Sequence, residues 1–142
     1  MNQRLRFHVF IVPGQAISQQ PPRSVTKKGR TWTYRPNSTK DYIKRVAEVI
    51  RLRTKPLPKS SPVRLWILFY LKIGKKGSLT AKHDLDKLAG SILDSLTGRV
   101  YEDDSQVVEL ITRKEKGEPR TVIVVEELPH DEQIEMRNDD DA

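Results

Sequence analysis

The residues with the clearest chemical potential in this chain are carboxylates grouped in one stretch. Asp84 and Asp86 are separated by a single residue, Asp94 follows further along, and Asp103 and Asp104 are neighbours. Carboxylate oxygens are the ligands that hard cations such as Mg²⁺ prefer. Paired magnesium ions activate water and neutralise the leaving oxygen during phosphodiester hydrolysis. The stretch is therefore a candidate metal site for phosphodiester chemistry.

A structural role competes with this interpretation of the same carboxylates. Asp84 stands where a helix is expected to begin, so its side chain can cap that helix. Asp86 would then lie in the first turn, near the positive end of the helix dipole. Two aspartates separated by one residue are common in proteins. From the residues alone, metal binding and helix capping both stay open.

The carboxylates lie in a strongly basic chain, and this bears on the kind of substrate. Its 26 Lys and Arg outnumber its 19 Asp and Glu, which gives a formal net charge of +7 over 142 residues. Basic clusters of this kind suit the phosphate backbone of a nucleic acid, although a solvated basic surface explains them equally well. The clusters are Arg23, Lys27, Lys28 and Arg30; Lys72, Lys75, Lys76 and Lys82; and Arg113, Lys114 and Lys116.

Composition also excludes several classes of protein. The chain has no cysteine, so disulfides, thiolate metal sites and cysteine nucleophiles are excluded. No run of apolar residues is long enough for a membrane span, and the first residues lack the apolar core of a signal peptide. We therefore expect a cytoplasmic protein with no membrane partner. The length suits a single domain over residues 1–129, and the acidic segment 130–142 is expected to be a disordered tail.

The apolar periodicity predicts an α+β domain with a mixed β-sheet and two helices, in the order β-α-β-α-β-β. Strands are expected over 5–12, 63–73, 107–113 and 120–127, with the second strand central because both of its faces are apolar. The last two strands are expected to form a hairpin through Lys116-Gly117-Glu118-Pro119. Residues 15–36 are expected to form a long basic loop or loose hairpin.

The two predicted helices carry different parts of the argument. The first begins at Asn37 or Ser38 and runs to about Arg53, before a proline-rich segment. The second begins at about Leu85 and ends near Gly98; its leucines and an isoleucine recur at helical spacing and leave Asp86 and Asp94 on the polar side. If the strand after Asp104 lies beside this helix, four carboxylates would converge.

Three motifs, taken together, resemble a known family of nucleases. They are, in chain order, Asp84-Leu85-Asp86-Lys87-Leu88, Asp94-Ser95-Leu96 and Asp103-Asp104-Ser105-Gln106-Val107. Their order and spacing are similar to the RusA family of Holliday-junction resolvases, whose pattern is D-x-D-N-L, then D-x-L in a helix, then D-D-x-Q-V. The resemblance extends from about residue 6 to residue 127 and includes Arg23 and Tyr34 in the basic loop.

The resemblance implies a homodimer that binds branched DNA and resolves four-way junctions by paired symmetric nicks, with Mg²⁺ as cofactor and Mn²⁺ able to substitute. It implies an enzyme of DNA recombination and repair, encoded by a bacterium or a phage. By motif match the catalytic metal ligands are Asp84, Asp86 and Asp104, with Asp103 as a further candidate ligand. The candidate DNA contacts are Arg23, Lys27, Lys28, Arg30, Tyr34, Lys75, Lys76 and Lys82.

Two departures from the family pattern affect the expected chemistry. Lys87 stands where the family has asparagine, and Gly90 stands where it has a functional lysine. We expect Lys87 to be catalytic in place of that lysine, because both positions lie within about one helical turn of Asp86. An impaired enzyme, or one that uses Lys82, is the alternative.

Two other functions stay open from the sequence. One is a nuclease of the same fold that acts on other branched DNA in phage replication or packaging. The other is a catalytically inactive, structure-selective DNA-binding protein. Smaller features have two explanations each: His83 is a metal or phosphate contact or an ordinary surface residue, and Trp32 stacks on unpaired bases or packs its own loop.

Overall fold

A long apolar strand lies at the centre of the fold. Strand β4 (Val63–Leu71) pairs in parallel with β5 (Val107–Lys116) and antiparallel with β6 (Arg120–Glu127), which in turn pairs with β1 (Phe7–Pro13). The sheet order is β1-β6-β4-β5. Alternate β4 side chains, from Val63 to Leu71, are buried, and the residues between them are half-buried. The predicted central strand is confirmed.

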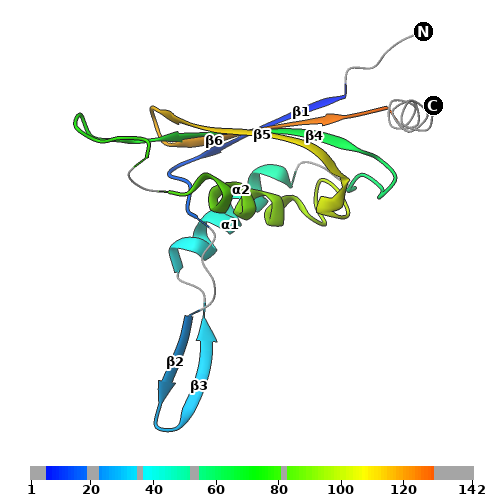
Figure 1. Ribbon diagram of the computed structural model, residues 1–142. Helices are drawn as coiled ribbons and strands as arrows, with labels where there is room; N and C mark the ends of the chain where they lie inside the picture. The colour runs from blue at the N-terminus through cyan, green and yellow to red at the C-terminus, as the bar shows by residue number, and fades with distance from the viewer. Residues whose placement is uncertain (1–5, 19–22, 35–36, 52–54, 81–82, 130–142) are drawn as a thin grey trace, which may run out of the picture.

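The computed structural model describes residues 6–18, 23–34, 37–51, 55–80 and 83–129. In Figure 1 helices α1 (Asn37–Ile50) and α2 (Leu85–Leu96) lie on one face of the sheet, and no helix of the described residues covers the other face. The α+β class, the mixed sheet and the two helices agree with the prediction. The acidic segment 130–142 lies outside the described residues.

The predicted hairpin between the last two strands is wrong, because β4 lies between β5 and β6 in the sheet. Helix α2 carries the chain back across the sheet, so β5 enters parallel to β4, as a crossover connection requires. The chain then passes the end of β4, where the Gly117 amide donates to the Leu71 carbonyl at 3.0 Å. Strand β6 therefore pairs with β4 on its other side.

The predicted basic loop contains a regular antiparallel hairpin, which adds two strands to the expected order. Strand β2 (Arg23–Lys27) pairs with β3 (Arg30–Tyr34) as a separate two-stranded sheet. Lys28 and Gly29 form the turn with φ of 54° and 76°, the left-handed values that a two-residue type I′ turn requires. In Figure 1 the hairpin projects away from the main sheet.

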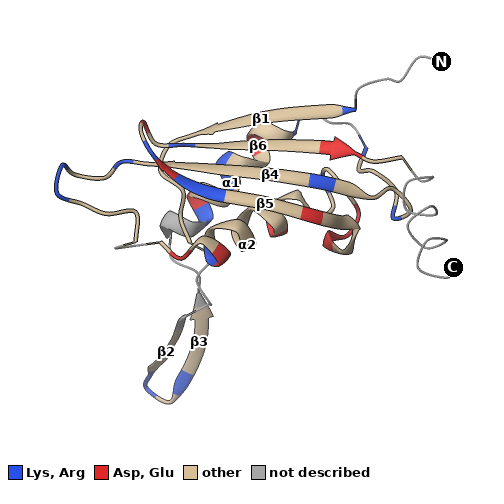
Figure 2. Cartoon of the chain, turned by 45° about the horizontal axis from the view of Figure 1, so that its top comes forward, with Lys and Arg blue, Asp and Glu red and all other residues tan. Residues whose placement is uncertain are grey.

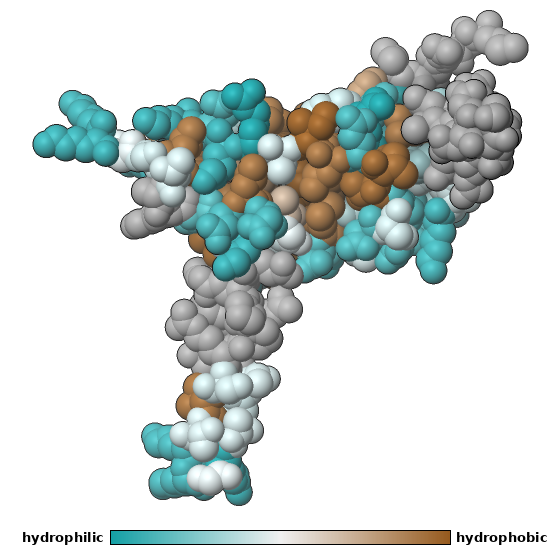
Figure 3. Space-filling model, in the orientation of Figure 1, coloured by the Kyte–Doolittle hydropathy of each residue, from teal (hydrophilic) through white to brown (hydrophobic). Residues whose placement is uncertain are grey.

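The face of the sheet opposite the helices carries apolar side chains. On β1, Phe10 and Val12 are buried towards the helices, whereas Phe7, Val9 and Ile11 are exposed by 44%, 60% and 56%. Both sets are apolar, so alternation alone does not decide which one faces the core. Figure 3 shows apolar side chains gathered over the body of the molecule. Two segments project from the body, the β2–β3 hairpin and the loop 74–80, and the tips of both are hydrophilic.

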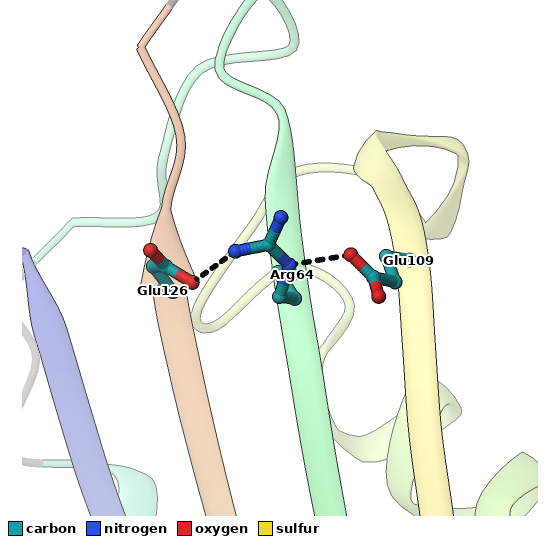
Figure 4. Close-up of polar contacts among 3 residues, drawn as sticks. All are labelled: Arg64, Glu109 and Glu126. Atoms are coloured by element: carbon teal, nitrogen blue, oxygen red, sulfur yellow. Dashed lines mark hydrogen bonds and ion pairs between the residues drawn. The ribbon is translucent and has the colours of Figure 1, made fainter.

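An ion-pair network crosses three strands on this same face. Arg64 on β4 donates through Nε to Glu109 on β5 and through Nη1 to Glu126 on β6, at 2.5 and 2.8 Å (Figure 4). These hydrogen bonds raise the pKa of Arg64 above its usual value. The guanidinium also lies 5.8 Å from the ring centre of Trp66. The network holds the β6-β4-β5 register at one end of the sheet.

Helix α1 connects the helical layer to the sheet through a buried hydrogen bond. Its apolar side buries Tyr42, Val46 and Ile50, and the helix ends three residues before the predicted Arg53. The Tyr42 hydroxyl lies 2.8 Å from the Thr121 hydroxyl on β6, and both residues are buried. Burial raises the pKa of Tyr42 to about 12. This contact is therefore a polar link inside an apolar core.

We predict that Tyr42→Phe lowers the free energy of unfolding by about 1–2 kcal/mol, because it leaves the buried Thr121 hydroxyl without this partner. Urea denaturation of the variant and the wild type measures the change. Tyr70→Phe on the open face is the matched control and should shift stability by less than about 0.5 kcal/mol. Equal effects of the two substitutions would contradict the role of the buried hydrogen bond.

Candidate functional site

Two carboxylates lie at the start of α2, where the connection from β4 enters the helix. Asp84 is the N-cap residue with an extended backbone, yet its side chain makes no capping hydrogen bond. Its carboxylate is 70% exposed, and the Lys87 ammonium lies 3.5 Å from its Oδ2. Asp86 is exposed in the first turn. Helix capping therefore does not account for Asp84 in this structure, and both carboxylates point to solvent beside a lysine.

The second group of carboxylates surrounds the connection between α2 and β5. Asp94, Asp103 and Asp104 line one open pocket together with Thr97 and Arg99. Asp104 begins a short 3₁₀ turn, η1 (Asp104–Gln106), and is exposed. The pKa of the Tyr101 phenol is raised above its usual value, mainly by burial. The negative charges of Asp104, Asp94 and Asp103 raise it further, so these carboxylates lie near Tyr101. The pocket is an acidic site of its own.

Asp103 has a structural role that distinguishes it from Asp84. Its carboxylate accepts hydrogen bonds from the hydroxyl and the backbone amide of Ser105, and these bonds lower its pKa. Asp103 and Gln106 together form a capping box around η1. The capping explanation therefore applies to Asp103 and not to the side chain of Asp84. Of the neighbours Asp103 and Asp104, Asp104 is the better placed to bind a ligand, because the Asp103 carboxylate is already hydrogen-bonded.

A buried amide holds the segment that carries this second group. Gln106 is 4% exposed, and its Nε2 donates to the carbonyls of Leu57, Pro58 and Ser61 at 3.3, 2.8 and 2.9 Å. Its Oε1 accepts from the backbone amides of Glu102 and Asp103, both at 2.9 Å. This side chain adds hydrogen bonds between two segments that the backbone amides of Leu57, Lys59 and Glu102 also join. Sequence reasoning noted Gln106 only as part of a motif.

Within one chain the two acidic groups do not converge. Helix α2 separates Asp84 and Asp86 from the pocket of Asp103 and Asp104, and twelve helical residues span about 18 Å. Figure 2 shows acidic positions at both ends of α2. Among the described residues, no three acidic or histidine side chains come close enough to hold a metal ion. The expected meeting of four carboxylates is thus not found in a single chain.

The predicted DNA contacts fall on two projections of the molecule. Lys27, Lys28 and Arg30 lie at the tip of the β2–β3 hairpin, and Lys75 and Lys76 lie on the exposed connection that follows β4 (Figure 2). Arg23 and Tyr34 pair at the base of the hairpin, and Lys82 lies outside the described residues. Two separate basic surfaces therefore extend from the body.

None of the described helices is long and apolar enough to cross a membrane. The fold and the site thus define an α+β protein with exposed carboxylates and two basic projections. A family model described as endodeoxyribonuclease RusA matches residues 13–126. This chain belongs to the RusA family of endodeoxyribonucleases. It is also 27% identical to the uncharacterized protein YqaN of Bacillus subtilis (strain 168) over 135 residues, 84% of this chain and 95% of YqaN.

We predict that Gln106→Ala destabilises the fold by about 2–3 kcal/mol, because it removes five hydrogen bonds of a buried side chain and leaves the Pro58 and Ser61 carbonyls and the Asp103 amide without this partner. Denaturant unfolding measures the loss. Ser105→Ala is a neighbouring control on an exposed side chain and should cost far less. A loss below about 1 kcal/mol for Gln106→Ala would show that the two loops are held by other contacts.

Proposed function

We propose that this protein is a magnesium-dependent, structure-selective endonuclease that resolves four-way DNA junctions by paired symmetric nicks. The observation that carries the proposal is a pair of exposed carboxylates at the start of α2, Asp84 and Asp86, in a chain of an endodeoxyribonuclease family. The Asp84 side chain makes no capping hydrogen bond to the helix. Exposed carboxylates in a basic protein offer hard oxygen ligands to a divalent cation.

In the proposed reaction, the residues at the start of α2 have two roles: two bind the cation and one contacts the phosphate. Mg²⁺, or Mn²⁺ in its place, supplies a polarised water and charge neutralisation when bound. Asp84 and Asp86 offer hard oxygen ligands for such an ion. Lys87, 3.5 Å from Asp84, is placed to neutralise charge on the scissile phosphate. Its ammonium is 59% exposed, so it can turn from Asp84 to a phosphate at little cost.

The acidic set of one chain is incomplete, and a two-fold dimer would complete it. Among the described strands, β5 pairs with β4 alone and forms an edge of the sheet, and it is ten residues long. It exposes Val108, Leu110 and Ile111 by 52%, 40% and 40%. The first half of this edge is largely apolar, while Arg113 to Lys116 are charged. Edge strands with free backbone groups are templates for pairing with another strand. We assign the partner of this edge to a second copy of the chain.

The direction of β5 explains how such a dimer would join the two acidic groups. Asp104 directly precedes the start of β5, while Asp84 lies near its other end, since Lys114 of β5 donates to the carbonyl of His83. In an antiparallel pairing of two β5 strands, the start of one lies beside the end of the other. Asp104 of one protomer would then approach Asp84 and Asp86 of its partner. The symmetry gives two identical sites, which suits a junction of two-fold symmetry.

The basic projections supply the contacts to DNA in this proposal. The hairpin tip and the exposed loop after β4 each place lysines away from the sheet, and the dimer doubles both surfaces. Contacts of this kind bind phosphates without reading bases and weaken as salt rises. Selectivity for branched DNA would then arise from the spacing of four basic surfaces rather than from sequence.

We predict that Asp86→Asn lowers the rate of junction cleavage in Mg²⁺ by at least about 10²-fold, because it removes a metal ligand where charge develops. Junction affinity, measured by gel shift without cleavage, should stay equal or become tighter because a negative charge is removed. Glu48→Gln makes the same charge change on an exposed side chain of α1, outside both acidic groups, and should leave both unchanged. The substrates are junction, flap, fork and linear duplex; a wild type that cuts none of them would refute the proposed function.

We further predict that mixing two inactive variants restores nicking. In the proposed dimer, a protomer with Asp86→Asn and a partner with Asp104→Asn share one doubly defective site and one intact site. Roughly half of the dimers in an equimolar, re-equilibrated mixture are of this mixed kind, by random pairing of identical interfaces. Junctions should then be nicked in one strand only. If both groups acted within one chain, every site would be defective, and the mixture would stay inactive.

A further inference from the structure

A half-buried lysine on β5 holds the segment that leads to the acidic pair. The Lys114 side chain lies on the helix-covered face of the sheet, in register with buried Phe69 of β4. Its ammonium donates to the carbonyl of Leu79 at 2.5 Å and to that of His83 at 3.1 Å. Both acceptors are backbone atoms of the connection between β4 and α2. The lysine therefore links an edge strand to the chain that delivers Asp84.

This connection has little structure of its own. Between the end of β4 and the start of α2 the described residues contain no helix or strand. The turn at Gly77, whose amide donates to the Gly74 carbonyl at 2.8 Å, is a local contact. Lys114 makes contacts that join this segment to the sheet, and charge-assisted hydrogen bonds are the stronger kind. Its removal would release the carbonyls of two residues on the same connection.

The contact with His83 bears directly on the direction of Asp84. His83 has φ of 65°, a left-handed conformation that a side chain other than glycine rarely adopts. Its carbonyl belongs to the same planar peptide unit as the amide nitrogen of Asp84. The hydrogen bond from Lys114 to the His83 carbonyl therefore restricts the orientation of the peptide unit that precedes the Asp84 side chain. Since the Asp84 side chain makes no capping bond, this peptide plane sets where the side chain starts, and the ion pair with Lys87 acts on its exposed end.

The charge of Lys114 suits this position as well. No carboxylate of the described residues forms an ion pair with it, and its two hydrogen-bond acceptors are backbone carbonyls. The neighbouring lysine on the same face, Lys116, reaches only the Gly77 carbonyl, at 3.3 Å, and is exposed. Lys114 is therefore distinguished from Lys116 by burial, by its number of acceptors and by its link to His83.

We propose that Lys114 is a positioning residue of the acidic site: it fixes the connection before α2 and thereby the direction of the Asp84 carboxylate towards a divalent cation. This inference rests on the proposed function for its link to catalysis. Groups that orient a metal ligand typically change metal affinity by about 10- to 100-fold when they are removed. The role is one of orientation, and Lys114 itself need not touch the DNA.

The test compares Lys114→Met, Lys114→Arg and the matched control Lys116→Met in the full-length chain. Methionine keeps an unbranched stem on the half-buried face but removes the charged donor, and arginine keeps donors and charge. One measurement is the Mg²⁺ concentration that gives half the maximal single-turnover cleavage rate. A second, which needs no activity, is the Mg²⁺-dependent rise in Tm. A third is amide hydrogen exchange over the connection between β4 and α2, without metal.

We expect Lys114→Met to raise the half-saturating Mg²⁺ concentration by about 10-fold or more. It should shift the Tm response to correspondingly higher Mg²⁺ and speed exchange at the connection, with junction affinity little changed. Lys114→Arg should recover most of each effect, and Lys116→Met should resemble the wild type. Lys114→Met with wild-type exchange and an unchanged Mg²⁺ dependence of Tm would overturn the inference, as would equal effects of Lys116→Met.

The outcomes also separate this inference from the proposed function. A wild type that cuts no branched DNA refutes the nuclease, yet the exchange and Tm measurements still decide whether Lys114 orders the acidic segment. A wild type that cuts junctions, with a Lys114→Met variant that differs only in overall Tm, leaves the nuclease in place and refutes the positioning role.

Discussion

The parallel pairing of β4 with β5 is the constraint on which the rest of the structure depends. Two parallel neighbours require a crossover, and α2 supplies it, so the helix must run antiparallel to both strands. Its first turn then lies near the ends of β4 and β5, and its last turn lies near their starts. The two acidic groups, which flank α2 in sequence, are consequently held apart by the length of the helix. The same pairing leaves β5 at the edge, where a second chain can be added.

Two polar side chains, one at each end of β5, hold the irregular segments that carry the acids. Gln106 joins the loop after α1 to the segment of Asp103, and Lys114 joins β5 to the connection before Asp84. Buried or half-buried polar groups of this kind are stable only when their partners are in place. They therefore select one arrangement of loops that apolar packing alone would leave open. A site that must meet a cation with defined geometry benefits from such preorganisation.

Charge is distributed unevenly over the two faces and the projections. On the open face, Arg64 is neutralised by Glu109 and Glu126, and the surrounding surface is apolar. Exposed carboxylates lie at the two ends of α2, and the basic tips belong to the hairpin and the loop after β4. DNA carries a dense negative charge and is repelled by unpaired carboxylates unless cations intervene. The helical side is thus the face where the proposed cation and the proposed substrate belong together.

The sequence by itself determined the elements whose signals are local. The strand 120–127 was predicted at its observed bounds, and the helix that begins at Leu85 was predicted to end near Gly98, two residues beyond its observed end. Apolar periodicity and turn residues mark both elements, and the three motifs identified the family. Tertiary structure alone decided that β4 separates β5 from β6, that Phe10 rather than Val9 faces the core, and that Asp103 caps a turn while Asp84 caps nothing. These features depend on contacts between segments far apart in the chain, and a one-dimensional pattern carries no record of which segments meet. For the same reason the spacing of the aspartates predicted one acidic site, whereas the direction of α2 produced two.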